Sequence, residues 1–267
     1  MTTAALPVLM YHSIGGRVPT ALRELSVDPG LLAEQLDALA GAGYVLTGLT
    51  EALDQRERGP APAPHVAVTV DDGYTDFLDH GLGVLRDSGA RCTLYVPTRE
   101  LGASPSWLSD AGDLRLMGLP DVVRLAAEPE VEIGSHSAVH VPLDSRPRRR
   151  MADEVAESRT VLQDATGQPV DSLAYPHGYH DDRVRMTVHS AGYRSACAIG
   201  HRVAPRGEDP YAVSRLLVGP DDTPERLLER VAGSQDAELR ARVKRWAGPP
   251  WRWTRRAVRS TTGKVLT

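Results

Sequence analysis

Cysteine is scarce in this sequence, and a membrane-spanning stretch and a secretory signal are missing. The two cysteines, Cys92 and Cys197, each lie in an apolar run, so we expect buried free thiols and no disulfide framework. No stretch approaches the roughly 20 apolar residues of a membrane-spanning helix, and the N-terminal segment lacks the basic region of a signal peptide. These absences favour a cytoplasmic location. No glycine-rich phosphate loop follows a predicted strand, so a nucleotide-binding fold has no direct support.

Charge is spread unevenly along the chain. The formal net charge of −4 does not point to a nucleic-acid partner. Residues 239–267 hold nine of the 31 Arg and Lys and no Asp or Glu, which leaves residues 1–238 with 22 basic against 35 acidic groups. We therefore predict one domain over 1–238 and a basic, Trp-containing tail over 239–267. The tail could contact an anionic membrane surface, bind an acidic protein surface, or stay solvated.

Predicted strands and helices alternate through the body of the chain. The strand signals fall at residues 6–11, 44–46, 66–70, 92–96, 131–135, 173–175, 193–199 and 212–218. Most are followed by a helical pattern, the main ones near 29–41, 50–58, 75–88, 121–127, 148–166, 182–191 and 223–232. This alternation predicts a parallel α/β sheet, and the length favours a (β/α) barrel over an open doubly wound sheet. Residues 97–119 form a long insertion of the kind that often faces a substrate.

Two adjacent carboxylates, Asp71 and Asp72, end the apolar strand at 66–70 and are followed by Gly73. Adjacent side chains at a strand end point in different directions, so the pair could face one cavity in separate roles. The carboxyl ends of parallel strands are where α/β enzymes place their chemistry. A tight turn at Asp72-Gly73 with a solvated Asp71 explains this short sequence equally well.

Two histidines, His136 and His140, follow another predicted strand end. Four residues apart, they share one face of a helical turn and could chelate a single divalent ion. Such a pair is weak evidence alone, but with Asp72 it makes a set of two histidines and one carboxylate. That set leaves positions open, as in catalytic metal sites, and leaves Asp71 free to accept a proton.

A third strand end carries Tyr175, Pro176 and His177, followed by Gly178. Pro and Gly make a rigid turn, whose backbone N–H groups could face the cavity. An ordinary turn between strand and helix is the alternative.

The three segments together resemble the ordered motifs of the polysaccharide deacetylase family of carbohydrate esterases. The matching residues are Thr69-Val-Asp-Asp-Gly73, His136-Ser-x-x-His140 and Ala174-Tyr-Pro-His-Gly178, and the likeness extends over residues 6–218. The resemblance implies a distorted barrel of seven or eight (β/α) units and metal-dependent removal of N- or O-acetyl groups from a carbohydrate. The segment Met10-Tyr-His-Ser13 near the start of the chain resembles one branch of the family, which includes poly-N-acetylglucosamine deacetylases. In that branch the order of the barrel elements is permuted, so that this element comes first in the sequence.

The resemblance also implies roles for individual residues. Asp71 becomes the general base, and the turn at His177 supplies a backbone N–H to the oxyanion. Asp72, His136 and His140 become ligands of one divalent ion, for which we expect zinc, with cobalt, nickel or manganese as alternatives.

This sequence departs from the family pattern at two positions. Ala174 stands where most members have the arginine that steadies the base, and we hypothesise that Arg215, inside an apolar strand, pairs with Asp71 instead. Members of the family also carry an apolar-x-His motif late in the sequence, which supplies the general acid. The C-terminal third of this chain has no clean copy of it, so His12 at the first strand end is the favoured general acid and His201 the alternative.

Three further residues are candidates for substrate contact. His177 replaces the aromatic residue usual at its position, and Tyr74 and Trp107 could stack on a sugar ring, although core packing explains an aromatic as well. The other histidines, His65, His80, His180 and His189, have no partner pattern and are interpreted as surface or structural.

The sequence leaves rival functions open beside a deacetylase of an N-acetylated or O-acetylated amino-sugar carbohydrate. One is an enzyme acting on a small or lipid-linked N-acyl sugar, which the lack of an export signal favours. The other is a catalytically silent carbohydrate-binding barrel. Ala174 and the missing late histidine favour the silent barrel, and the intact base and ligand set weigh against it.

Overall fold

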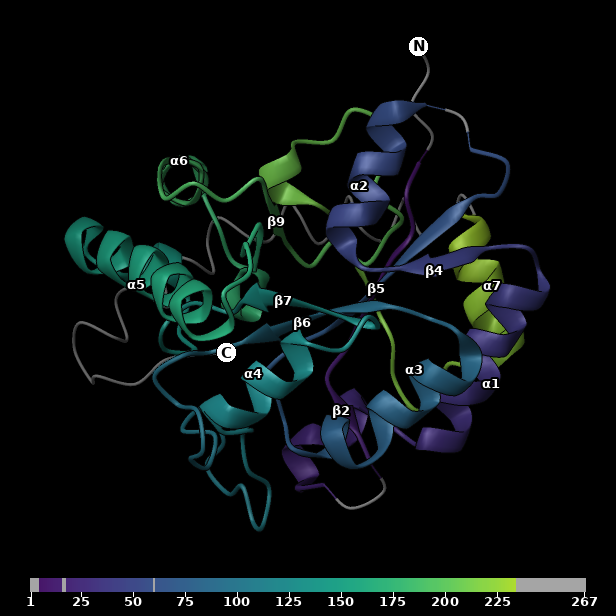
Figure 1. Cartoon of the computed structure of the whole chain (residues 1–267), viewed down its shortest axis with the longest axis horizontal. Helices are drawn as coiled ribbons and strands as arrows, with labels where there is room; N and C mark the ends of the chain where they lie inside the picture. The colour runs from purple at the N-terminus through teal and green to yellow at the C-terminus, as the bar shows by residue number, and fades with distance from the viewer. Residues whose placement is uncertain (1–4, 16–17, 60, 234–267) are drawn as a thin grey trace.

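Eight parallel strands form a curved central sheet in the computed structural model, which describes residues 5–15, 18–59 and 61–233 (Figure 1). The predicted basic tail lies outside these residues. The strands are β1 (Val8–Tyr11), β4 (Val45–Thr47), β5 (His65–Val70), β6 (Cys92–Val96), β7 (Val131–Ser135), β8 (Ser172–Ala174), β9 (Ser195–Cys197) and β10 (Leu216–Leu217). Their order is β10-β1-β5-β6-β7-β8-β9, and β4 pairs with the first half of β5.

The short segment from Val213 to Leu217 connects the two edges of this sheet. Val213 forms a parallel bridge with Cys197 at the end of β9, and Leu216 pairs with Leu9 of β1. The sheet therefore curls almost into a barrel, as the sequence predicted. The prediction of one continuous strand over 212–218 was wrong, because the chain changes partner strand between Val213 and Leu216.

Helices surround the curled sheet (Figure 1). They are α1 (Pro29–Gly41), α2 (Leu49–Arg58), α3 (Leu82–Ser88), α4 (Leu119–Ala126), α5 (Arg148–Thr166), α6 (Asp182–Ser190) and α7 (Pro224–Ala232). Among the described residues, no helix combines the length and the apolar character needed to cross a bilayer. A separate pair, β2 (Ser13–Ile14) and β3 (Ser26–Val27), lies between β1 and α1 in the chain.

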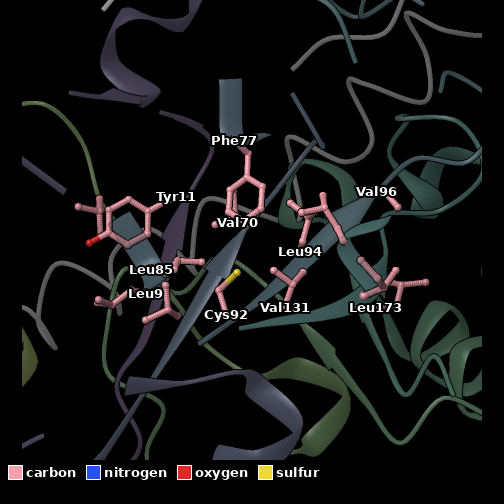
Figure 2. Packing of buried hydrophobic residues seen from close by; sticks show 14 of the residues in the cluster. Leu9, Tyr11, Val70, Phe77, Leu85, Cys92, Leu94, Val96, Val131 and Leu173 are labelled. Carbon is pink, nitrogen blue, oxygen red and sulfur yellow. The ribbon is translucent and has the colours of Figure 1, made fainter. Parts of the chain in front are cut away.

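Alternation along the strands divides the core residues of the sheet between an outer and an inner cluster. Large aliphatic residues such as Leu94 and Leu173 point outward and pack under the helices, where Figure 2 shows them with Phe77 and Leu85. Residues of the opposite parity, such as Ala67, belong to a smaller cluster inside the curled sheet. Its other members are Leu6, Val8, Leu49, Ala52, Leu53, Tyr95, Ala174, Cys197, Ala204 and Val213. Most members of this cluster are Ala, Val or Cys, so small side chains predominate inside the curled sheet.

The first turn of α2 closes the opposite end of the barrel. The Leu49 N–H donates to Thr93 Oγ1 at 2.7 Å, and the same hydroxyl donates to Glu132 at 2.6 Å. Glu132 also accepts from the Thr50 N–H at 3.3 Å. These bonds satisfy N–H groups that the start of any helix leaves free.

Three local predictions need correction. The helix expected over 75–88 is split into a π-helical turn at Phe77–Gly81 and then α3, and the strand expected over 193–199 covers only 195–197. Ala40 is exposed, and the buried stripe of α1 instead includes Gln35, which bonds to the Tyr11 hydroxyl at 3.0 Å. By contrast, the buried free thiols are confirmed.

Candidate active site

Strand parity brings three of the predicted site residues to the inner face at the carboxyl end of the barrel. Asp71 continues the inward positions of β5, and His12 and His136 continue those of β1 and β7. Asp72 would point the other way in a regular strand. Its φ of 73° breaks the alternation, and its side chain lies against two imidazoles of the site. Left-handed backbone at a residue other than glycine costs roughly 1 kcal/mol or more and is common at functional sites.

Asp72, His136 and His140 form one buried cluster. Oδ1 of Asp72 lies 3.3 Å from Nε2 of His136 and 3.2 Å from Nε2 of His140. One ligand atom from each residue fits within 4.8 Å of the others, and none of the three is more than 8% exposed. The sequence predicted this trio, and the structure brings it together.

The donor atoms of this cluster suit a divalent cation. Nδ1 of His136 lies 2.8 Å from the Ala174 carbonyl, so in the neutral ring that nitrogen carries the proton and Nε2 presents a lone pair to Asp72. The carboxylate oxygen Oδ1 of Asp72 is buried and accepts no hydrogen bond from the described residues. Lone pairs gathered in this way repel one another unless a proton or a metal ion lies between them. Two histidines and one carboxylate are ligands that zinc and neighbouring transition metals accept.

The segment from His136 to His140 is not the helical turn that the spacing predicted. It is an irregular bend with Ser137 at a φ of 67°. The bend is fixed from outside, because the N–H groups of Thr98 and Arg99 donate to its carbonyls at 3.2 and 2.8 Å. The two rings still meet, with centroids 4.8 Å apart.

Arg215 and Asp71 form the hypothesised ion pair. Nη1 and Nη2 donate to the two carboxylate oxygens at 2.7 Å each, and both side chains are at most 3% exposed. Nη1 also donates to Thr69 Oγ1 at 3.1 Å, and Nε donates to the Ala198 carbonyl at 3.2 Å. Burial raises the pKa of Asp71 and is the largest single effect, but the charge and hydrogen bonds of Arg215 together with the neighbouring His136 and His12 outweigh it and hold that pKa below its ordinary value.

His12 faces the same cluster from the end of β1. Burial lowers the pKa of the His12 imidazole, and the charges of Asp72 and Asp71 oppose that shift. Its Nδ1 is buried and without a hydrogen-bond partner among the described residues. His12 follows the first strand of the chain, far in sequence from the other site residues, but the fold still brings it near both carboxylates.

The turn at Tyr175, Pro176 and His177 lies beside His140. The His177 and His140 rings meet edge to face with centroids 4.4 Å apart, and His177 has a φ of 58°. Burial and the neighbouring His140 lower the pKa of His177 to about 3, so its ring is neutral near pH 7. The Tyr175 hydroxyl donates to the Tyr211 carbonyl at 2.8 Å, so this residue contributes a packed side chain and a turn backbone.

The long insertion between β6 and α4 brings Trp107 to the site. Its ring centroid lies 4.1 Å from that of His140, and its Nε1 donates to the Tyr74 hydroxyl at 3.2 Å. Trp107 is half-buried, but Tyr74 is only 1% exposed. Of the two interpretations of Tyr74, the structure supports core packing and not sugar stacking, because its ring is enclosed by packing that includes Leu22, Leu114 and Leu116.

Sequence reasoning did not assign a role to two residues at the site. Thr69 accepts from Arg215 and donates to the Leu9 carbonyl at 2.7 Å, and a polar residue within an apolar strand was a signal for it. Tyr95 lies under the Arg215 guanidinium, with 5.7 Å between Cζ and the ring centroid. Because side chains alternate along a strand, the position of Tyr95 on β6 could have indicated an inward side chain. It could not have indicated Arg215 as the partner.

Fold and site together define a class: an α/β barrel protein with a cluster that could hold a metal ion and a second buried carboxylate at the carboxyl ends of its strands. The model of the polysaccharide deacetylase family matches residues 58–196, slightly more than half of the 267-residue chain. The chain therefore belongs to the polysaccharide deacetylase family, a family of carbohydrate deacetylases, and the resemblance found in its motifs is confirmed.

Individual relatives agree with this placement. YxkH of Bacillus subtilis (strain 168), assigned as a polysaccharide deacetylase, is 24% identical over 218 residues, which cover 81% of this chain and 72% of YxkH. The Streptococcus pyogenes deacetylase PplD superposes with a TM-score of 0.74 at 23% identity, over 86% of this chain and 99% of PplD. IcaB from Ammonifex degensii gives 0.73 at 21% identity, over 86% and 98%. These similarities confirm the distorted (β/α) barrel fold.

Proposed function

We propose that this protein is a metal-dependent deacetylase that hydrolyses N-acetyl groups of an amino-sugar-containing carbohydrate. The observation that carries the proposal is the arrangement of two neighbouring carboxylates with different partners. Asp72 faces two imidazoles, and Asp71 is clamped by Arg215. Membership in the polysaccharide deacetylase family supports the reaction class, and PplD was solved in complex with acetate, the product that deacetylation releases.

Asp72, His136 and His140 would hold one divalent ion, with zinc as the first expectation. When bound, such an ion supplies a Lewis acid that polarises the acyl oxygen and acidifies water. His136 is kept in the ligating tautomer by its bond to the Ala174 carbonyl.

Asp71 acts as the general base. Its carboxylate accepts a proton from water as the water oxygen attacks the carbonyl carbon of the acetyl group. Arg215 keeps Asp71 ionised and fixes its orientation through two charge-assisted bonds. The backbone N–H at His177 donates to the oxyanion of the tetrahedral intermediate.

His12 acts as the general acid. The C–N bond breaks as protonated His12 donates a proton to the departing amine, and acetate and the free amino sugar leave. Because burial lowers the pKa of His12, its protonated form gives up a proton more readily than an exposed imidazolium does. Trp107 and His177 line the site beside His140 and contact the sugar.

Acetate release from a substrate panel tests this proposal. The panel contains N-acetylglucosamine oligomers, the monomer, a lipid-linked N-acyl sugar and an O-acetylated sugar, assayed with metal-loaded protein and after chelation. We expect acetate from N-acetylated sugars, loss of activity after chelation and recovery on adding metal. Acetate from the O-acetylated sugar alone would show that the substrate is an ester and not an N-acetyl group. Acyl release from the monomer or the lipid-linked sugar alone would show that the substrate is not a longer carbohydrate. Binding without turnover of any of them would favour a silent carbohydrate-binding barrel.

A further inference from the structure

Tyr95 is a buried aromatic residue inside the barrel that the proposed mechanism does not use. It lies on β6, is fully buried, and belongs to the inner core cluster together with Ala174 and Cys197. Its ring lies beneath the guanidinium of Arg215, with Cζ 5.7 Å from the ring centroid. That distance is within the range of a cation–π interaction, which is strongest where water is excluded.

The guanidinium of Arg215 is already held along its edges. Its hydrogen bonds run in the plane of the group to Asp71, Thr69 and the Ala198 carbonyl. In-plane bonds do not prevent the planar group from tilting about its contact with a carboxylate. An aromatic ring packed against one face restrains that tilt, and Arg stacks well on aromatic faces.

Tyr95 is itself fixed from both ends. Its hydroxyl donates to Ser172 Oγ at 3.1 Å. On the β7 side, the ring packs against the backbone of Gly134, where an added Cβ would come within 2.4 Å of ring atoms Cδ1 and Cε1. The ring therefore cannot move toward β7, and its hydroxyl bond fixes its direction within the barrel.

We infer that Tyr95 is a positioning residue for the proposed reaction: its ring holds Arg215 in the plane that lets both terminal nitrogens meet the oxygens of Asp71. The inference rests on the proposed function, because it assigns Asp71 as the base. It predicts that loss of the ring lowers turnover and leaves the metal cluster and substrate binding unchanged, since the ring of Tyr95 lies against Arg215.

Kinetics of Tyr95→Leu and Tyr95→Phe test this inference. We expect kcat to fall about tenfold in Tyr95→Leu, with KM and metal content unchanged, and to stay within about twofold of wild type in Tyr95→Phe, which keeps the ring. If Tyr95→Leu does not fold, Tyr95→Met replaces it. Equal losses in the Leu and Phe variants would assign the effect to the hydroxyl and overturn the inference.

Tyr193→Leu is a matched control. Tyr193 is 2% exposed and lies under Arg159, with 5.6 Å between Cζ and the ring centroid. Its hydroxyl donates to the Val155 carbonyl at 3.1 Å, so the substitution removes a buried ring that contacts a half-buried arginine on the outer side of the sheet. We expect lower stability with unchanged kcat. A kcat loss equal to that of Tyr95→Leu would show that general destabilisation, not positioning, explains both.

A readout independent of activity separates this inference from the proposed function. Exchange of the Arg215 guanidinium protons with water, followed by NMR, should accelerate at least tenfold in Tyr95→Leu and remain slow in Tyr95→Phe. Unchanged exchange in Tyr95→Leu overturns the inference even if the enzyme is a deacetylase. The proposed function is overturned if the wild-type protein is inactive or if the Asp71→Asn variant is active. In either case the exchange rates still decide whether the ring of Tyr95 holds the Arg215 guanidinium in place.

Discussion

Asp71 and Asp72 are adjacent in sequence and almost equally buried, yet their nearest polar partners differ. Asp71 is bound on both oxygens by the permanent charge of Arg215, whereas Oδ1 of Asp72 faces two imidazole nitrogens and accepts no hydrogen bond from the described part of the chain. A carboxylate with a fixed cation is held as an anion in one orientation. A carboxylate that faces imidazole nitrogens needs a proton or a metal ion between the facing atoms. The comparison shows that roles here follow from partners, because residue type is the same and burial is almost the same.

The Asp72 side of the comparison should give the largest effect. Asp72→Asn and His136→Ala each remove a ligand, so we expect loss of bound metal and a fall in kcat/KM of roughly 1,000-fold or more. Metal analysis of purified protein and acetate release measure the two outcomes. His189→Ala is the control, since His189 is exposed and packs on Tyr211. Retention of stoichiometric metal by both ligand variants would contradict the site.

Asp71→Asn tests the other carboxylate. The substitution removes the base and keeps the three ligands, so we expect normal metal content and a loss of about 10²- to 10⁴-fold in kcat. Metal analysis and single-turnover kinetics check this result. Substantial turnover in this variant would exclude Asp71 as the base.

Arg215→Met leaves Asp71 as a buried charge without its partner. Removing one member of such a pair costs about 3–5 kcal/mol, so we expect a large loss in the free energy of unfolding and a lower kcat. Denaturant unfolding measures the first quantity. A variant as stable as wild type would show that the pair contributes no net stability.

His12→Asn should discriminate between substrates. An amide needs a proton on its leaving nitrogen, and a nitrophenyl ester does not, so we expect about 100-fold loss of kcat on the amide and a small change on the ester. Parallel assays of N-acetylglucosamine oligomer and nitrophenyl acetate measure the ratio. Equal losses on both substrates would remove His12 as the acid, and His201→Asn would then be compared.

Thr69→Val should give the smallest effect. It removes a hydrogen bond to Arg215 and one to the Leu9 carbonyl while the two bonds to Asp71 remain, so we expect about 1 kcal/mol lower stability and kcat within about twofold. Thr47→Val is the matched control, because the Thr47 hydroxyl is buried without a hydrogen-bond partner among the described residues. We expect it to be neutral or stabilising. Equal destabilisation by both substitutions would mean that the Arg215 contact is not the cause.

The sequence by itself determined the alternation of strands and helices, the strand ends that carry Asp71 and His136, and the family. These features are local: apolar period, turn residues and short motifs reflect the geometry of a few neighbouring residues. It also indicated Arg215 as a partner for Asp71, because a buried arginine in an apolar strand needs a counter-charge.

Only the tertiary structure decided how these pieces meet. Asp71 and Arg215 are 144 positions apart, and they touch because the segment from Val213 to Leu217 passes from β9 to β1 and curls the sheet. The irregular bend at Ser137, the burial of Tyr74 and the ring of Tyr95 beneath Arg215 also depend on packing between distant segments. Short-range patterns fix which face a side chain points to, and sheet closure fixes what it meets there.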